Sequence, residues 1–470
     1  MSRQLGNAIL SGLIGTVIFT ALAHGAVETW SLAIFALLII SLTALWGIRA
    51  VVNKQLTLNI PRVVFPLGLL LIWGLIQSIV YTDSSGQRHS LSMDVEATRQ
   101  ITTVLFILLL ALLLTASLLV HREYLSKLPM LLTGYGFVLA LFGLIQYFSW
   151  DGRFFWWRQT TNLVTSPFGP FVAHNHFAGY MELLLPIPIA LVVMQVGRIE
   201  ARIFCGFAAA LMGSAAIASL SRGGFISLFV QLIFLAAAAS FIPRQRQQSR
   251  RSYQRKSANI VTPVMAVIVI TIAIGASIYW IGLEPVINRI AQGKLVTPDV
   301  KDIKDAKEES FLVSRGWIWR DTTTMIRAHF ATGVGLGAFE TVFPIYSQSD
   351  GSLQIGQAHN DYLQLVAEAG IVGAVLLLWF VGIVMSQTLR GLRSSDPFVA
   401  ALALGSGGSM VGMMVHSIFD FNLQLPSHAL LLIVLTAVLA RVSVPEAVPA
   451  VVPIMEPGSV ESGFTKTITS

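Results

Sequence analysis

The sequence has 470 residues, of which 54% are hydrophobic and only 12% are charged, and its mean hydropathy is +0.72. Soluble domains carry about 25% charged residues, so this composition excludes an ordinary soluble protein and indicates a chain that crosses a membrane repeatedly. The net charge of +7 does not indicate a nucleic-acid-binding protein, because the basic residues gather between the apolar runs, where they orient a membrane protein.

Apolar runs predict about twelve membrane-spanning helices and therefore an all-α polytopic membrane protein. The first run lacks a clear small-residue cleavage site and is predicted to be a retained span rather than a removed signal peptide. Cys205 is the single cysteine, which excludes a disulfide within the chain and a cysteine metal site. The predicted spans are residues 7–25, 29–48, 63–81, 101–120, 128–148, 177–196, 203–220, 224–242, 260–282, 370–388, 398–418 and 428–443.

These spans divide the chain into four regions. Residues 1–282 form an N-terminal bundle of about nine spans, 283–369 form a long outer loop, and 370–444 form about three further spans. The tail 445–470 is rich in Pro, Val, Ser and Thr without a helical period and is predicted to be disordered. Lys and Arg in the short loops, densest at residues 244–256, predict a cytoplasmic N-terminus and a long loop on the outer side.

Two short outer segments have unusual compositions. Residues 149–176 contain Trp150, Trp156 and Trp157, and such aromatic residues are typical of the membrane interface. The hinge at 219–224 carries one arginine, Arg222, between two apolar runs. Arginine beside a span is costly, so Arg222 is either an interfacial anchor or part of a functional site.

The long loop contains a predicted amphipathic helix, which lies on the membrane or against the span bundle. Arg315 precedes Trp319 by one helical turn and is predicted to point toward a packed interior, the alternative being a surface charge. The glycines at 333–337 follow this helix and predict a helix stop and turn rather than a phosphate cradle. The apolar stripe of the helix consists of Leu312, Trp319, Ile326 and Phe330.

His359 stands at the junction between the long loop and the next span. Asn360 and Asp361 can each cap a helix, residues 362–369 have helical spacing, and Gly370 is a suitable helix end. His359 is therefore predicted to begin a short helix at the membrane surface. The alternative is a polar junction residue without a chemical role.

A site on the outer face is predicted from three residues, Arg222, Arg315 and His359. Two guanidinium groups suit a diphosphate, because their planar forks bind phosphate oxygens bidentately and keep their charge. A histidine beside them accepts a hydroxyl proton near neutral pH. The combination predicts a lipid-linked diphosphate as the leaving group and a sugar hydroxyl as the nucleophile.

Four motifs follow one another along the chain. They are Asn175-His176-Phe177-Ala178-Gly179-Tyr180, Ser221-Arg222-Gly223, Arg315 with Trp319 ahead of Gly333-Val334-Gly335, and Ala358-His359-Asn360-Asp361-Tyr362-Leu363-Gln364. In this order and in these topological positions they resemble the O-antigen ligase and polymerase superfamily of bacterial membrane glycosyltransferases. The resemblance covers most of the chain.

The resemblance implies a GT-C-like helical bundle in the bacterial inner membrane that acts at the periplasmic face. The implied donor is a glycan on undecaprenyl diphosphate, the acceptor is lipid A–core or another glycan, and neither a metal nor a nucleotide cofactor is required. His359, Arg315 and Arg222 match the family's catalytic residues. The residues predicted to bind substrate around them are His174, Asn175, His176, Trp319, Arg320, Asn360 and Tyr362.

A second class of function, a transporter or flippase for lipid-linked glycans, also fits about twelve spans. A flippase needs charged residues inside several spans, whereas these spans are nearly free of charge, and the long outer loop ending at His359 favours the enzyme. The outer loops contain no Asp-x-Asp pair and no His-Glu-x-x-His helix that would indicate a metal. Ligase, glycan polymerase and protein O-oligosaccharyltransferase all remain open, because acceptor choice depends on surface shape.

Overall fold

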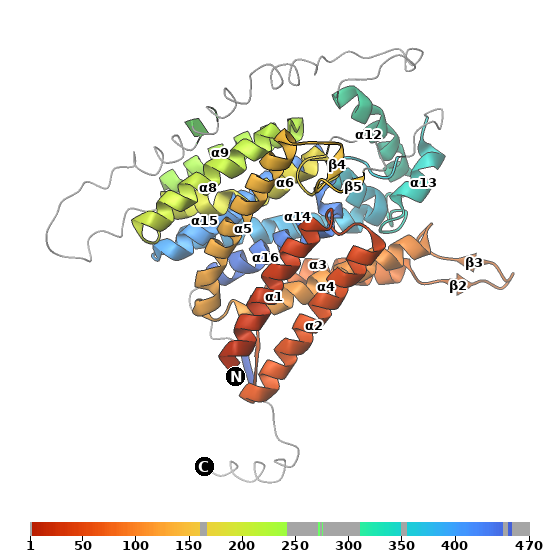
Figure 1. Ribbon diagram of the computed structural model, residues 1–470. Coiled ribbons are helices and arrows are strands. Elements are labelled where there is room, and N and C mark those ends of the chain that lie inside the picture. The colour runs from red at the N-terminus through yellow and green to blue at the C-terminus, as the bar shows by residue number, and fades with distance from the viewer. Residues whose placement is uncertain are drawn as a thin grey trace, which may run out of the picture.

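The computed structural model describes residues 2–159, 167–241, 271–272, 275, 311–348, 355–444 and 450–453. The predicted span at 260–282 lies almost wholly outside these residues, as do the first part of the long loop and most of the tail. Helices account for most of the described chain (Figure 1). They are α1 (Ser2–Leu22), α2 (Thr29–Asn53), α3 (Val64–Gln77), α4 (Val95–Leu118), α5 (Arg122–Phe148), α6 (His174–Leu184), α7 (Pro186–Val193), α8 (Ile199–Ala218), α9 (Arg222–Phe241), α12 (Phe311–Ala328), α13 (Phe339–Tyr346), α14 (Asp361–Leu392), α15 (Pro397–His416), the 3-10 helix η1 (Asn422–Gln424) and α16 (Pro426–Val442).

Three short antiparallel strand pairs accompany the helices. The β2–β3 hairpin projects away from the bundle (Figure 1). Residues 450–453 form β6 and pair with β1, whereas the sequence predicts a disordered tail over this stretch. The strands are β1 (Gln55–Leu58) with β6 (Ala450–Pro453), β2 (Tyr81–Thr82) with β3 (Arg88–His89), and β4 (Arg153–Phe154) with β5 (Arg158–Gln159).

The helices confirm an all-α, multi-pass membrane protein. Among the described residues, nine helices are long and apolar enough to cross a membrane. Two predicted spans, 63–81 and 428–443, are helices of 14 and 17 residues, α3 and α16. α3 is shorter than predicted because it ends at Gln77, whose side-chain amide donates to the carbonyls of Thr332 and Glu368 at 2.8 and 2.9 Å.

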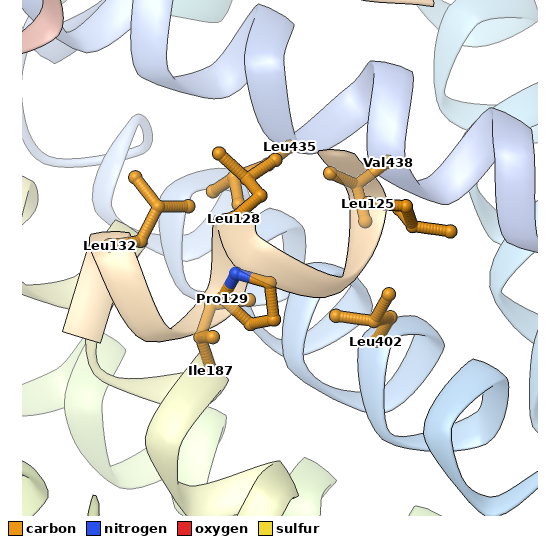
Figure 2. Close-up of a pocket in the computed structure, with 8 residues that line it drawn as sticks. All are labelled: Leu125, Leu128, Pro129, Leu132, Ile187, Leu402, Leu435 and Val438. Atoms are coloured by element: carbon orange, nitrogen blue, oxygen red, sulfur yellow. The ribbon is translucent and has the colours of Figure 1, made fainter. Parts of the chain in front are cut away.

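Several helices begin earlier than the sequence predicts, and α5 is one of them. α5 starts at Arg122 instead of near residue 128 and contains Pro129 in its interior. Proline lacks a backbone N–H and cannot complete the helical ladder, so packing beside it is imperfect. A small pocket opens there between α5, α7, α15 and α16, and hydrocarbon side chains line it (Figure 2). None of the predicted site residues lines this pocket, which we interpret as a packing defect.

The central helix of the bundle is α15, which packs against α6, α7, α9, α14 and α16. Close approach requires small residues on its surface. A methyl group at Gly412 would lie 2.2 Å from the side-chain nitrogen of Gln231, so a larger residue there would displace this side chain of α9. The segment formed by α6 and α7 is the most enclosed of the candidate spans.

The described part of the long loop folds against the bundle, where α12 and α13 pack on each other and on α14 (Figure 1). The predicted stripe is partly wrong. Ile318 and Met325 form the buried face of α12, whereas Trp319 and Ile326 are half-buried and Phe330 is 55% exposed. The buried face is displaced by one residue from the predicted stripe because α12 packs against α13 and α14. Phe330 lies outside the helix, which ends at Ala328.

The glycine run after α12 forms the predicted turn. Gly333 and Gly335 have φ angles of +70° and +113°, a region that favours glycine. A methyl group at Gly333 would lie 2.2 Å from the carbonyl oxygen of Glu368, so the turn touches the α14 backbone directly. Gly370 also behaves as predicted: its φ and ψ of 62° and −153° separate a short first helix in α14 from the span that follows.

Candidate active site

His359 lies immediately before α14, with its side chain about one-third exposed at 32%. Its backbone φ of 49° is in the left-handed region, which a non-glycine residue adopts only when its surroundings hold it there. Two contacts do so. The indole of Trp319 donates to the carbonyl of Ala358 at 3.0 Å, and Asn360 caps α14 by accepting from the N–H groups of residues 362 and 363 at 3.0 Å.

The Nδ1 atom of His359 faces Asp420, whose Oδ1 lies 3.4 Å away. Asp420 follows α15 and is almost fully buried. It also accepts from the side-chain amide of Asn175 and from the N–H of Phe421. Burial alone raises the pKa of Asp420, but the hydrogen bond from His359 and the nearby positive charge of Arg315 lower that pKa well below its usual range. Asp420 is therefore an anion in the folded protein.

Arg315 interacts with this carboxylate, and Arg222, on a different helix, interacts with Arg315. Arg222 is the first residue of α9, and Arg315 lies in the first turns of α12. Burial lowers the pKa of the Arg315 guanidinium; Asp420 opposes this shift and Arg222 adds to it. Arginine nevertheless stays protonated in proteins. The prediction that Arg315 points inward is confirmed, because its Nη1 atom is buried.

His176 is close to His359 but differs from it in exposure. The ring of Phe421 lies between the two, with its centroid 4.9 Å from each imidazole centroid. His176 is 7% exposed, and its Nδ1 atom lies 3.0 Å from the Oδ1 atom of Asn422. His359 is thus the ring of this pair that a substrate can reach.

The other predicted substrate-binding residues have mixed surroundings. Asn175 is in the site through its bond to Asp420, and His174 begins the same helix, α6. The hydroxyl of Tyr362 donates to the carbonyl of Met414 at 2.6 Å, so it ties α14 to α15. The Nε atom of Arg320 instead donates to Asp321 at 2.9 Å, with the side chain of Arg320 57% exposed.

Sequence reasoning missed Asp420 and considered Asp361 only as a possible helix cap, a position that Asn360 takes. Asp361 accepts from the hydroxyl of Ser417 at 2.8 Å and from the N–H of Leu423 at 3.2 Å, which fastens the segment after α15 to the start of α14. One signal was available for Asp420: the span predicted at 398–418 ends on the outer side, so an acidic residue two positions later belongs on the same face as His359.

Metal binding has no candidate within the described residues, where no group of three His, Cys, Asp or Glu side chains is arranged to hold an ion. Independence from metals and cofactors stays a prediction.

Residues 207–378 match the family model described as O-antigen ligase. The match covers just over a third of the chain, and over that segment the chain is similar to the O-antigen ligase family. The match confirms the resemblance for the motifs at 221–223, 315–335 and 358–364, whereas the motif at 175–180 precedes it. This similarity implies a membrane glycosyltransferase of the O-antigen ligase and polymerase family. The matched segment contains Arg222, Arg315 and His359 but ends before Asp420. No curated protein gives a significant match to the chain.

Proposed function

We propose that this protein transfers a glycan from undecaprenyl diphosphate to a sugar hydroxyl of lipid A–core or a similar acceptor. The reaction takes place at the periplasmic face of the bacterial inner membrane. The observation that carries the proposal is the pairing of the accessible His359 ring with the buried, ionised Asp420. Arg315 from α12 interacts with Asp420, and Arg222 from α9 interacts with Arg315.

His359 is the general base in this proposal. Because its Nδ1 atom faces a carboxylate, the neutral ring carries its proton on Nδ1 and its lone pair on Nε2. The acceptor hydroxyl gives its proton to Nε2 as its oxygen attacks the anomeric carbon of the donor. Asp420 stabilises the imidazolium that forms, without taking up the proton itself.

Arg222 and Arg315 bind the leaving group. The bond between the anomeric carbon and the diphosphate oxygen breaks, and its electron pair departs with undecaprenyl diphosphate. Two fixed guanidinium groups stabilise this growing negative charge without reorganising, which is the largest effect available to a site without covalent chemistry. Asp420 also limits the mutual repulsion of the arginines, because it lies close to Arg315.

Two alternatives within the family share this chemistry: an O-antigen or exopolysaccharide polymerase, and a protein O-oligosaccharyltransferase. A transporter of lipid-linked glycans is the alternative outside it. It needs no base, so an imidazole beside an ionised carboxylate favours transfer over transport.

The test is glycan transfer in proteoliposomes that contain the purified protein, a lipid-linked donor and lipid A–core. His359→Ala is expected to lower turnover by about 10²–10⁴-fold, as loss of a general base does. His329→Ala is the matched control, since His329 also lies in the outer segment but its Nε2 atom is 2.7 Å from the hydroxyl of Tyr346. Equal turnover in both variants would exclude His359 as the base. Transfer to a glycan or a protein substrate instead of lipid A–core would select one of the alternatives.

A further inference from the structure

Four polar side chains meet inside the helix bundle, within segments long and apolar enough to span a membrane. We call them the intramembrane cluster: Glu182 on α6, Ser227 and Gln231 on α9, and His416 at the end of α15. All four are fully buried. The Nδ1 atom of His416 lies 3.0 and 3.2 Å from the two carboxylate oxygens of Glu182. The view that the spans are nearly free of charge overlooked Glu182.

The other two members join α9 to this pair. The hydroxyl of Ser227 bonds to the Glu182 carboxylate and lies 2.8 Å from the carbonyl of Gly412 on α15. The amide of Gln231 donates to the carbonyls of Glu182 and Gly408 at 2.8 and 3.0 Å. Each contact crosses from one helix to another, so the cluster fixes α6, α9 and α15 to one another.

All three helices have one end at the candidate active site. α6 begins with the segment that carries Asn175, α9 begins with Arg222, and α15 ends at His416, four residues before Asp420. The cluster is also near Arg222 along α9. A methyl group on the adjacent Gly223 would lie 3.4 Å from Nε2 of His416 and 3.1 Å from the Cβ of Phe419.

Holding helices together with buried polar groups costs free energy. Ionisable groups inside a membrane are costly and by default indicate function. Apolar residues of similar volume often stabilise a fold as well as a buried ion pair does, whereas losing one partner leaves a buried group uncompensated. The geometry gives the pair another use, because its directional contacts set the relative positions of three helix ends.

We propose that the Glu182–His416 pair is a positioning device that holds the ends of α6, α9 and α15 so that Arg222 and Asp420 stay in register around the donor diphosphate. This inference rests on the proposed glycan transfer. The pair contacts neither substrate nor reacting atoms and acts through the residues that do.

Glu182→Gln is the principal variant, because it keeps the shape of the side chain and replaces its carboxyl group by an amide that cannot ionise. Displacing catalytic groups by about 1 Å costs on the order of 10²-fold in rate, so kcat is expected to fall by about 10- to 100-fold. The donor KM is expected to change by less than about threefold, since the arginine charges remain. The kcat of the double variant Glu182→Gln/His416→Gln is expected to be no lower than that of the less active of the two single variants, because both changes disrupt one unit.

Ser409→Ala is the matched control. The Ser409 hydroxyl is also fully buried and donates to the carbonyl of Leu183 at 2.7 Å, so it joins α15 to α6 as well, but it lies outside the cluster. Rates are normalised to folded protein, measured by thermal unfolding in detergent. The proposal expects Ser409→Ala to lose stability while kcat stays within about twofold of wild type. An equal fall of kcat in Ser409→Ala and Glu182→Gln would overturn it, because general loosening of the helices would then explain both.

If Glu182→Gln does not fold, Ser227→Ala is used instead, since it removes one hydroxyl and leaves the Glu182–His416 contact in place. Its kcat is expected to fall by about three- to tenfold, and an unchanged kcat in folded Ser227→Ala protein overturns the proposal. His359→Ala is measured in parallel. Loss of transfer in His359→Ala with full transfer in Glu182→Gln rejects only the positioning role. Full transfer in His359→Ala rejects His359 as the general base, whereas absence of glycan transfer in the wild-type protein rejects the glycan-transfer proposal itself.

Discussion

Replacing Asp420 by asparagine removes one negative charge from the candidate site and almost none of the side-chain volume. The nearest atoms of His359 and Asp420 are 3.4 Å apart. Two unit charges at that distance attract by about 5 kcal/mol at an effective dielectric constant of about 20. The ring of His359 is 32% exposed, so solvent screening reduces this to about 2–3 kcal/mol.

The charge of Asp420 matters most when His359 has taken up a proton, so its loss is felt in the transition state rather than in donor binding. A loss of about 2–3 kcal/mol corresponds to a fall in kcat of about 30- to 200-fold. Asparagine also offers an N–H to Nδ1 in place of an acceptor, which favours the wrong tautomer and adds to the loss.

The assay is the initial rate of glycan transfer in proteoliposomes, with kcat and donor KM determined separately. Asp321→Asn is the control, because Asp321 is equally buried and accepts from Arg320 and from the N–H of Gln348, away from His359. A kcat for Asp420→Asn within threefold of wild type would refute the assignment of Asp420 as the partner of the base.

Three other predictions concern the rest of the fold. Burial lowers the pKa of His24 below its usual value, although its hydrogen bond to the Pro170 carbonyl opposes this shift. Burying the neutral ring therefore contributes stability above about pH 6.5 that is lost as pH falls. Proteolysis of residues 167–173 is expected to speed up below pH 6 in wild type but not in His24→Gln. Gly333→Ala is expected to lower the free energy of unfolding by about 2–5 kcal/mol, because the added methyl group strains the turn and contacts the α14 backbone. Gly86→Ala is the control in the same thermal unfolding assay: Gly86 has a φ of +81° but open space around it, so the expected cost is only about 1–2 kcal/mol. In a Cys205→Ala background, an impermeant thiol reagent added to spheroplasts is expected to label Ser85→Cys but not Arg393→Cys, and the reverse pattern contradicts the orientation predicted from the basic loops.

Features that depend on neighbouring residues could be predicted from the sequence. Most predicted spans are helices, the glycine run forms a turn, and Gly370 interrupts α14, because hydropathy, left-handed φ angles and capping are local properties. Arg315 was also predicted to face inward, because Trp319 marks the packed side of the same helix one turn later.

Features that depend on distant residues could not be predicted in this way. Asp420 is 61 positions from His359, and α3 ends where Gln77 reaches residues more than 250 positions away. The buried face of α12 is set by the surfaces of α13 and α14, which the periodicity of α12 alone does not describe. The pairing of Glu182 with His416 likewise requires the arrangement of three helices.

The matched segment is not sufficient to build the site. Residues 207–378 supply His359 and both arginines, but Asn175 precedes the segment and Asp420 follows it. Asp361 links the matched segment to the residues that follow α15, because its backbone N–H lies 2.9 Å from the carbonyl of Ser417 and 3.2 Å from that of Asp420. His359 and Asp420 therefore come into contact only when α15 packs beside the start of α14. If His359 is the base as proposed, its proton transfer depends on helices outside the matched segment, and changes in α15 are expected to affect the reaction without touching a substrate.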